Sequence, residues 1–391
     1  MDPRQPINAP HDRIQCPVNP IYASALSRST PFFEELGQLM GMPYHQFEYN
    51  GAAVPMFQDG PIWNSPVELL LASSNFFIAV NEVPFNVRDF CFWLHESTGN
   101  SVSVSDIGPS FHEDHGLFAE ECVVLEASHF WLPGSFDKYL SSLAHDDRKT
   151  LRKILHNNRS IEVVFDNDGR RLWEPMRQAY TERMMKKFGY TAQTAEKITG
   201  TIDLTVKHMA KLGTGLIVGM FSEGHQVAAS IFERSRGCVF HYTDITVPSH
   251  GTNLCRFSIT KAIEYAINEG DSFFDVGHIW NDISMKCDFS FKRRYVPKSE
   301  KRKNELYCFG IWTSTGKDYY LSKYPYEIIY APFYLDGKIQ AQHYEAISAS
   351  EAQLAEHRIL NAEVLRSNRS RGTISNMSTN PAASISMDEE N

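Results

Sequence analysis

Residues able to move protons gather near the ends of two predicted strands. Tyr242 and Asp244 lie in one apolar run, and Asp275, Gly277 and His278 end another. A carboxylate at the end of a strand, followed by glycine, can act as a general base or can orient a ligand amine. The same pattern also suits a turn or capping aspartate, so both interpretations of Asp275 stay open.

The segment between these runs can approach a phosphate. Gly251, Thr252, Asn253 and Leu254 open a predicted helix, and small or hydroxylic residues let a ligand reach the backbone there. The first N–H groups of a helix have no intrahelical acceptor and carry partial positive charge. A simple capped helix, with Thr252 or Asn253 as the N-cap, explains the same residues.

Residues 215–292 provide the elements that position these groups. Three short strands joined by tight turns at 223–224 and 235–237 come first, followed by a helix over residues 254–267 that ends near Gly270. A strand at 272–276 then returns parallel to the third strand. Such a right-handed unit places the helix N-terminus at the carboxyl edge of the strands, where ligands bind in open α/β sheets.

Two basic segments accompany this unit. Arg148, Lys149, Arg152, Lys153 and Arg159 stand on a helix predicted over residues 140–155 and just beyond it. Residues 286–303 hold eight Lys or Arg against two acidic residues. Either segment is explained by a solvated surface or by contact with a phosphate-rich ligand such as a nucleotide, coenzyme A or a tRNA end.

Composition narrows the classes of protein. The 391 residues carry a net charge of −9 and are 42% hydrophobic, which argues against a general nucleic-acid coat and against a membrane-surface protein. Neither a membrane span nor a signal peptide is evident, so we expect a cytoplasmic protein that uses no membrane and no DNA. Seven scattered cysteines and the HEDH sequence at 112–115 do not match a disulfide framework or a metal motif, and we expect no metal.

The patterning predicts an α/β (α+β) chain in several parts. An irregular arm covers residues 1–30, an N-terminal α/β half covers 31–135, and a second domain covers 136–345. A helix over 346–367 and a disordered tail over 368–391 follow. Further helices are predicted over residues 31–40, 172–187 and 202–212, and strands over 101–107, 121–127, 161–165 and 307–312.

Several spans resemble the GNAT acyltransferase superfamily, in its CelD/BcsL-like branch related to the FemAB aminoacyl transferases. They are SFDKYLSSLAHDDRKTLRKILHNNR, GLIVGMFSEGHQVAASIFERSRGCVFHYTD and AIEYAINEGDSFFDVG, which together cover about residues 136–292. The family's Tyr-Lys pair after this last motif is closest to Met285-Lys286, with Phe291-Lys292 as a second candidate. In place of its Pro-Gly turn, this chain has the sequence VPSHG at 247–251.

The resemblance implies a mixed twisted sheet flanked by helices, and two tandem GNAT-like halves are common among the proteins that the chain resembles. It implies no permanent cofactor and acyl-CoA as a co-substrate, with the thioester near Tyr242 and Asp244 and the pyrophosphate near residues 251–254. An amine would attack the carbonyl directly, with Asp275 or His278 as base, Tyr242 as acid for the leaving thiolate and Lys286 as a further site residue.

Three functions therefore stay open. The first is an acyltransferase that moves an acyl group from an acyl-CoA or another thioester to an amine of a small molecule or peptide. The second is an aminoacyl transferase that draws on aminoacyl-tRNA, with the basic segments on RNA phosphates. The third is a binding protein of the same fold without catalysis.

Overall fold

The computed structural model describes most of the chain between residues 24 and 340. The described residues are 24–26, 29–65, 86–107, 123–167, 170–188, 190–247, 253–279, 281–282, 287–288, 290–300, 305–323, 333–335 and 338–340. They all belong to one compact unit, residues 1–345. The predictions for residues 1–23, for the 112–115 sequence and for everything after 345 lie outside the described residues.

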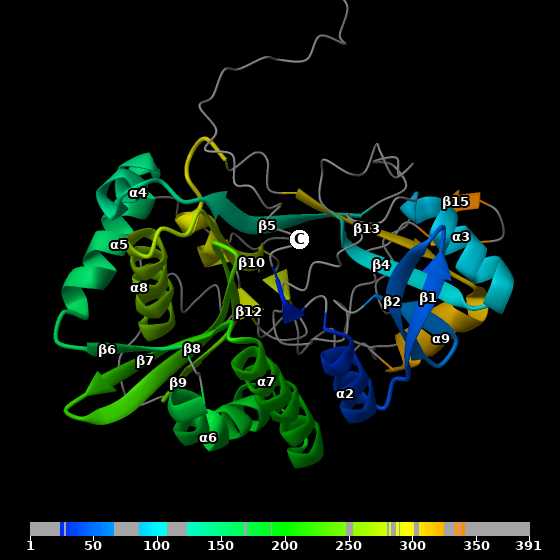
Figure 1. Cartoon of the computed structure of the whole chain (residues 1–391), viewed down its shortest axis with the longest axis horizontal. Coiled ribbons are helices and arrows are strands. Elements are labelled where there is room, and N and C mark those ends of the chain that lie inside the picture. The colour runs from blue at the N-terminus through cyan, green and yellow to red at the C-terminus, as the bar shows by residue number, and fades with distance from the viewer. Residues whose placement is uncertain are drawn as a thin grey trace, which may run out of the picture. The chain divides into compact units, whose positions relative to one another are not determined.

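One mixed β-sheet runs through the described part of the chain (Figure 1). Its main path is β1-β2-β3-β4-β13-β5-β10-β9-β8-β7-β6, with β14 and β15 beside β13. The strands of this path are β1 (Tyr44–Tyr49), β2 (Ala52–Asp59), β3 (Ile62–Asn64), β4 (Ser101–Ile107), β5 (Val123–Trp131), β6 (Glu162–Asp166), β7 (Gly215–Ser222), β8 (His225–Ser235), β9 (Cys238–Thr246), β10 (Phe273–Ile279) and β13 (Glu305–Ile311). The short strands are β11 (Asn281–Asp282), β12 (Cys287–Asp288), β14 (Phe333–Leu335) and β15 (Lys338–Gln340). The predicted α/β class, a mixed sheet flanked by helices, is confirmed.

Helices join and cover these strands. They are α2 (Thr30–Met40), α3 (Val87–Thr98), α4 (Phe136–Ser142), α5 (His145–Asn157), α6 (Arg170–Phe188), α7 (Ala192–Leu212), α8 (Leu254–Asn268), α9 (Ser314–Lys323) and the 3-10 helix η5 (Ser290–Tyr295). The prediction of a single helix over 140–155 is wrong, because the backbone is extended at Leu143 and Ala144, which separate α4 from α5. The helix predicted to begin at Ile202 begins ten residues earlier, where the Thr191 side chain accepts the Thr194 N–H.

The same order of elements occurs twice. In the first half, the antiparallel strands β1, β2 and β3 are followed by α3 and by β4, which is parallel to β3. In the second half, β7, β8 and β9 are followed by α8 and by β10, which is parallel to β9. The described residues therefore contain two tandem copies of the unit predicted for residues 215–292.

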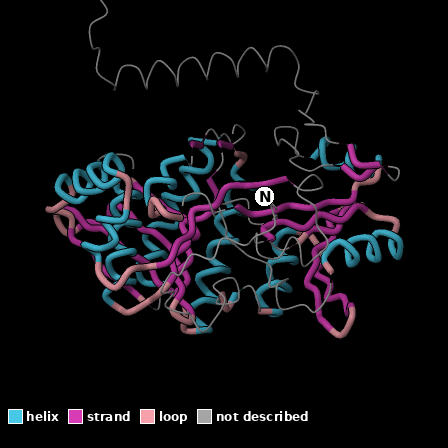
Figure 2. Tube along the Cα trace, turned by 90° about the horizontal axis from the view of Figure 1, so that it is seen from above, coloured by secondary structure: helices cyan, strands magenta, loops and turns pink. Residues whose placement is uncertain are grey.

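The two halves exchange their next strands. β5 follows β4 along the chain but pairs antiparallel with β10, whereas β13, the next strand of the large sheet after β10, pairs with β4. β5 and β13 also pair with each other, so the strands form one connected band in Figure 2. Neither half closes its own sheet, and each copy of the unit depends on a strand from the other.

Helices cover both faces of the second half (Figure 1). Side chains of α6 and α7 share a core with Ile231, Phe240 and Tyr242, while α4, α5 and α8 share another with Phe232 and Phe274. Alternation along a strand sends successive side chains to opposite faces, so the two cores lie on opposite sides of the sheet. We call these sides the α6–α7 face and the α8 face.

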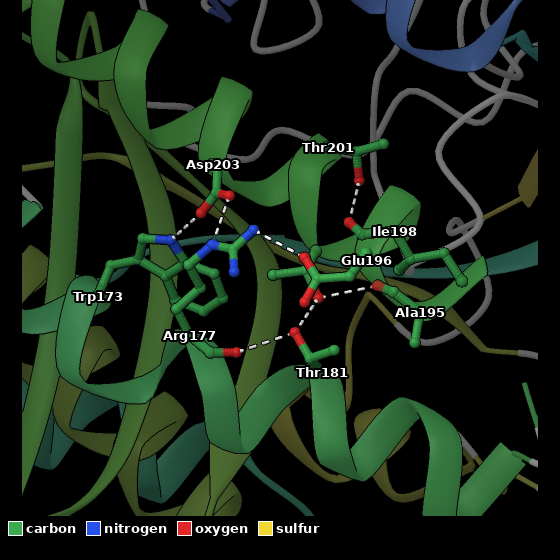
Figure 3. A network of polar contacts seen from close by, with 9 residues as sticks. Trp173, Arg177, Thr181, Ala195, Glu196, Ile198, Thr201 and Asp203 are labelled. Carbon is green, nitrogen blue, oxygen red and sulfur yellow. Dashed lines mark hydrogen bonds and ion pairs between the residues drawn. The ribbon is translucent and has the colours of Figure 1, made fainter. Parts of the chain in front are cut away.

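A polar network joins α6 to α7 (Figure 3). Asp203 accepts hydrogen bonds from Trp173 Nε1 at 2.7 Å and from Arg177 Nε at 2.7 Å. Arg177 also reaches Glu196 at 3.0 Å, where both side chains are largely exposed. Asp203 thus provides a hydrogen-bond acceptor for the indole N–H of Trp173, a residue that is only 3% exposed.

Replacing Asp203 by alanine is expected to destabilise the protein by about 1–3 kcal/mol, because the buried Trp173 N–H loses its acceptor. The matched control is Glu196→Gln, which removes only the exposed ion pair of the same arginine and is expected to cost about 0–1 kcal/mol. Urea unfolding of both variants measures the difference. Equal losses in the two variants would mean that Trp173 does not need this acceptor.

Candidate functional site

β9 and β10 stop pairing with each other before either strand ends. Their parallel register comprises Cys238 with Phe273, Val239 with Phe274, and Phe240 with Asp275. Beyond these pairs β9 continues to Thr246 and β10 to Ile279, with no further pairing between them among the described residues. We call this parting of the strands the β9–β10 opening, and Asp275 stands at its vertex.

A bulge in β9 shapes the same place. Ile231 of β8 lies opposite Thr243, but its neighbour Phe232 lies opposite His241, so Tyr242 is an extra residue in β9. A bulge bends its strand and increases the local twist. Tyr242 packs into the core of the α6–α7 face and is 3% exposed.

The Tyr242 hydroxyl is engaged by a buried glutamate. It donates to Glu233 Oε2 at 2.7 Å, and Glu233 is fully buried. Burial, and after it the Glu233 carboxylate, raises the pKa of Tyr242 well above its usual value. This geometry disfavours the predicted role of Tyr242 as an acid for a leaving thiolate and favours a role in holding β8 and β9 together.

Glu233 also holds the segment that precedes α2. Its Oε1 accepts the backbone N–H of Ala25 at 2.6 Å and of Leu26 at 3.1 Å, while Oε2 accepts the Ser24 hydroxyl at 2.8 Å. Residues 24–26 are thereby fixed beside Tyr242. Burial raises the pKa of Glu233, and these hydrogen bonds offset only part of that rise.

Asp275 is fully buried at the vertex of the opening. Its Oδ1 accepts the backbone N–H of Gly277 at 2.6 Å. Gly277 has φ +95°, a conformation that suits glycine, and the register of β10 against β5 shifts between Asp275 and His278. Phe273 belongs to the core of the α6–α7 face, so alternation places Asp275 on the face that Tyr242 occupies.

Asp244 lies on the other face, in a network of its own. Its carboxylate accepts the Ser230 hydroxyl and lies 3.0 Å from His241 Nε2, and Ser230 contacts Ser258 of α8. Arg183 donates to the Asp244 carbonyl oxygen at 3.0 Å. Burial alone would raise the pKa of Asp244, but His241 and Ser230 outweigh it, so the pKa lies below its usual value.

This network fixes the start of α8 against β9. Asn253 is the N-cap in the left-handed conformation, with φ 85°, and its side chain caps no backbone N–H among the described residues. Leu254 is 2% exposed and anchors the first turn in the core of the α8 face. Gly251 and Thr252 lie outside the described residues, so phosphate binding at residues 251–254 stays a prediction.

The remaining predicted site residues are placed only in part. His278 lies in β10 opposite Ala127, and its side chain is outside the described part of the structure, as is the whole of Lys286. Lys292 lies in η5 and is 2% exposed, so it is not part of a solvated connector. The Ser128 hydroxyl of β5 donates to the Lys292 carbonyl oxygen at 2.8 Å.

Sequence reasoning missed the partners of the predicted residues. Glu233 comes directly after VAASIF, a run of apolar or small residues in β8, and a charged residue at the end of such a run is the one signal that marks it. Ser230 and Ser258 stand at ordinary positions of a strand and a helix. Only the fold shows that they meet Asp244.

The described residues hold neither a metal-binding cluster nor a membrane-spanning helix. No group of three or more His, Cys, Asp or Glu side chains there is arranged to hold a metal ion. No described helix is long and apolar enough to cross a membrane.

Comparison with known proteins finds similar solved structures but no close relative. No family model matches the sequence. No curated protein matches it significantly.

The similar structures include FemX, at 10% identity and a TM-score of 0.43, over 78% of this chain and 98% of that one. L-PGS from Bacillus licheniformis is 13% identical with a TM-score of 0.42, over 72% and 91%. A tandem GNAT protein from the clavulanic acid biosynthesis pathway is 9% identical with a TM-score of 0.37, over 67% and 80%. At these scores the likeness carries no inference about activity, which depends on the geometry of this chain.

The raised pKa of Glu233 predicts a pH-dependent stability. The folded protein holds this proton more tightly than the unfolded chain, whose carboxyl titrates near 4.5. Its stabilising contribution is therefore present below that pH and is lost as pH rises through the folded pKa. Glu233→Gln removes the titration, so the stability advantage of the wild type over the variant is expected to shrink between pH 4.5 and pH 8.

Urea midpoints at both pH values measure this difference. The control is Glu162→Gln, at an exposed position of β6. The difference in stability between the wild type and this control is expected to be the same at both pH values. An advantage of the wild type over Glu233→Gln that grows with pH would mean that Glu233 is stabilised as a carboxylate.

Proposed function

We propose that the protein is a GNAT-type N-acyltransferase. It moves an acyl group from an acyl-CoA, or from another acyl thioester, to an amine of a small molecule or peptide. The observation that carries the proposal is the β9–β10 opening, in which two parallel strands part at the buried Asp275.

The β9–β10 opening can provide backbone hydrogen-bond donors for the carbonyl group of a thioester. Where two neighbouring strands part, the backbone groups on their facing edges are turned toward a ligand instead of toward each other. A carbonyl placed between the strands meets N–H donors that stabilise the charge of a tetrahedral intermediate. The donor pyrophosphate would lie at the first turn of α8, where helix N–H groups favour an anion.

The acceptor amine attacks the carbonyl directly. Holding amine and thioester together supplies most of the rate, and a base removes the proton of the amine. Asp275 at the vertex acts in that proton transfer, as base or as the group that orients one, with His278 as the other predicted candidate. No covalent enzyme intermediate is required, and acyl-CoA is a co-substrate with no permanently bound cofactor.

A basic surface supports a second candidate, transfer from an aminoacyl-tRNA. Exposed cations on and just after α5 (Lys149, Arg152, Lys153 and Arg159) lie in the same region as exposed Arg293 and Lys298. Arg294 of η5 joins the two segments by donating to Thr150 at 3.2 Å. On a chain of net charge −9, such a cluster would attract a polyanion, and binding would weaken steeply with salt.

Thermal stability in the presence of ligands separates these candidates. Acetyl-CoA or a longer acyl-CoA at 100 times its dissociation constant is expected to stabilise the folded protein by about 2.7 kcal/mol, which raises the melting temperature. Total tRNA is the second ligand. Stabilisation by tRNA alone would favour the aminoacyl transferase, and stabilisation by neither would favour a binding protein without catalysis.

Replacing Asp275 by asparagine is expected to lower turnover of an acyl-CoA with a primary amine by about 10²–10⁴-fold, because proton removal then lacks its carboxylate. Thiol release measures the rate. The control is Asp271→Asn, which removes a buried carboxylate that pairs with Arg234 away from the opening, and turnover is expected to persist. Unchanged turnover in Asp275→Asn would remove Asp275 from the mechanism.

A further inference from the structure

The strand exchange places a histidine beside the vertex of the opening. β5 belongs to the first half by chain order, yet it pairs with β10, and His129 of β5 lies directly opposite Asp275. Residues that lie opposite each other in an antiparallel pair share a face, with their Cβ atoms on the order of 5 Å apart. The first half therefore contributes an imidazole to the acid of the second half.

The two side chains differ in their access to solvent. Asp275 is fully buried, whereas His129 is partly exposed. The His129 ring lies 5.7 Å from the ring of Phe273, which holds it on the α6–α7 face. A buried carboxylate beside a more accessible imidazole is the arrangement in which the acid orients the ring and the ring exchanges the proton.

The first half provides an internal comparison. There β3 and β4 form the corresponding parallel pair, and β13 takes the place of β5. The corresponding cross-strand pairs are Ser103 with Gly310 and Val104 with Phe309. Neither pair contains a carboxylate or an imidazole, so among the described residues this combination of acid and imidazole stands only at the β9–β10 opening and not at the corresponding place in the first half.

We propose that His129 is the general base of the reaction and that Asp275 is its positioning residue. The inference rests on the proposed acyl transfer. The amine nitrogen forms a bond to the thioester carbonyl carbon, and its proton passes to the imidazole of His129. The carbon–sulfur bond then breaks, and the thiolate takes the proton back from the imidazolium, so the products are an amide and a free thiol.

This assignment explains why a fully buried aspartate stands at the vertex. A carboxylate beside the ring fixes its orientation and stabilises the imidazolium that forms, while Gly277 N–H holds the carboxylate in place. Imidazoles titrate near neutral pH, which suits a base that must be deprotonated before each turnover. An ordinary packing role for His129 against Phe273 predicts no effect on proton transfer.

The test measures turnover of acetyl-CoA and octanoyl-CoA with ethanolamine and a lysine peptide as a function of pH. His129→Gln is expected to lower kcat by about 10²–10⁴-fold, to leave KM for the acyl-CoA unchanged and to abolish the rising limb of the pH profile. Added free imidazole is expected to restore part of the rate. His45→Gln, on an exposed position of β1, is the matched control and is expected to keep the wild-type profile.

A wild-type pH limb and kcat in a folded His129→Gln variant would overturn the assignment and leave the proposed acyl transfer intact. Absence of transfer from any donor by the wild type would overturn both. If glutamine disturbs the packing against Phe273, modification of the wild type by diethyl pyrocarbonate gives an independent answer. Loss of activity in step with modification of His129, located by mass spectrometry, supports the assignment, and full activity after that modification overturns it.

Discussion

β9 and β10 separate after Asp275, and the neighbouring strands must hold them apart. Two parallel strands that stop pairing leave backbone groups without their usual partners, so each strand must be held firmly on its other edge. β9 is held along its length by β8, and β10 is held by β5. Because β5 comes from the first half, the opening exists only while both halves share one sheet.

Buried charge is concentrated around this opening on both faces of the sheet. On one face Glu233 accepts hydrogen bonds from Tyr242, Ser24 and two backbone N–H groups. On the other face Asp244 accepts the Ser230 hydroxyl and contacts His241. A buried carboxylate without partners costs several kcal/mol, so each of these donors is needed for the fold to tolerate the acid. The first half also buries a carboxylate, Asp59, which accepts the Tyr319 hydroxyl at 2.8 Å.

The sequence predicts the second half well because its signals are local. The glycines of the turns at 224 and 237 and the apolar stripe of residues 254–267 give their elements a type and an end. The apolar run before Asp275 gives the type of β10 but not its end, because the strand continues to Ile279. It predicts the partners poorly, because His129 and Asp275 are brought together by a pairing between strands far apart in the chain. Periodicity within a strand carries no information about which strand lies beside it. The sequences of β5 and β13 therefore do not show that these two strands are exchanged between the halves.

The most direct test of the opening as the donor site is hydrogen–deuterium exchange with and without a non-hydrolysable acyl-CoA analogue. Bound analogue is expected to slow exchange in peptides that cover the ends of β9 and β10 and the first turn of α8, and to leave exchange in β3 and β4 of the first half unchanged. Protection confined to β3 and β4, or no protection at β9 and β10 under conditions where the analogue binds, would contradict it.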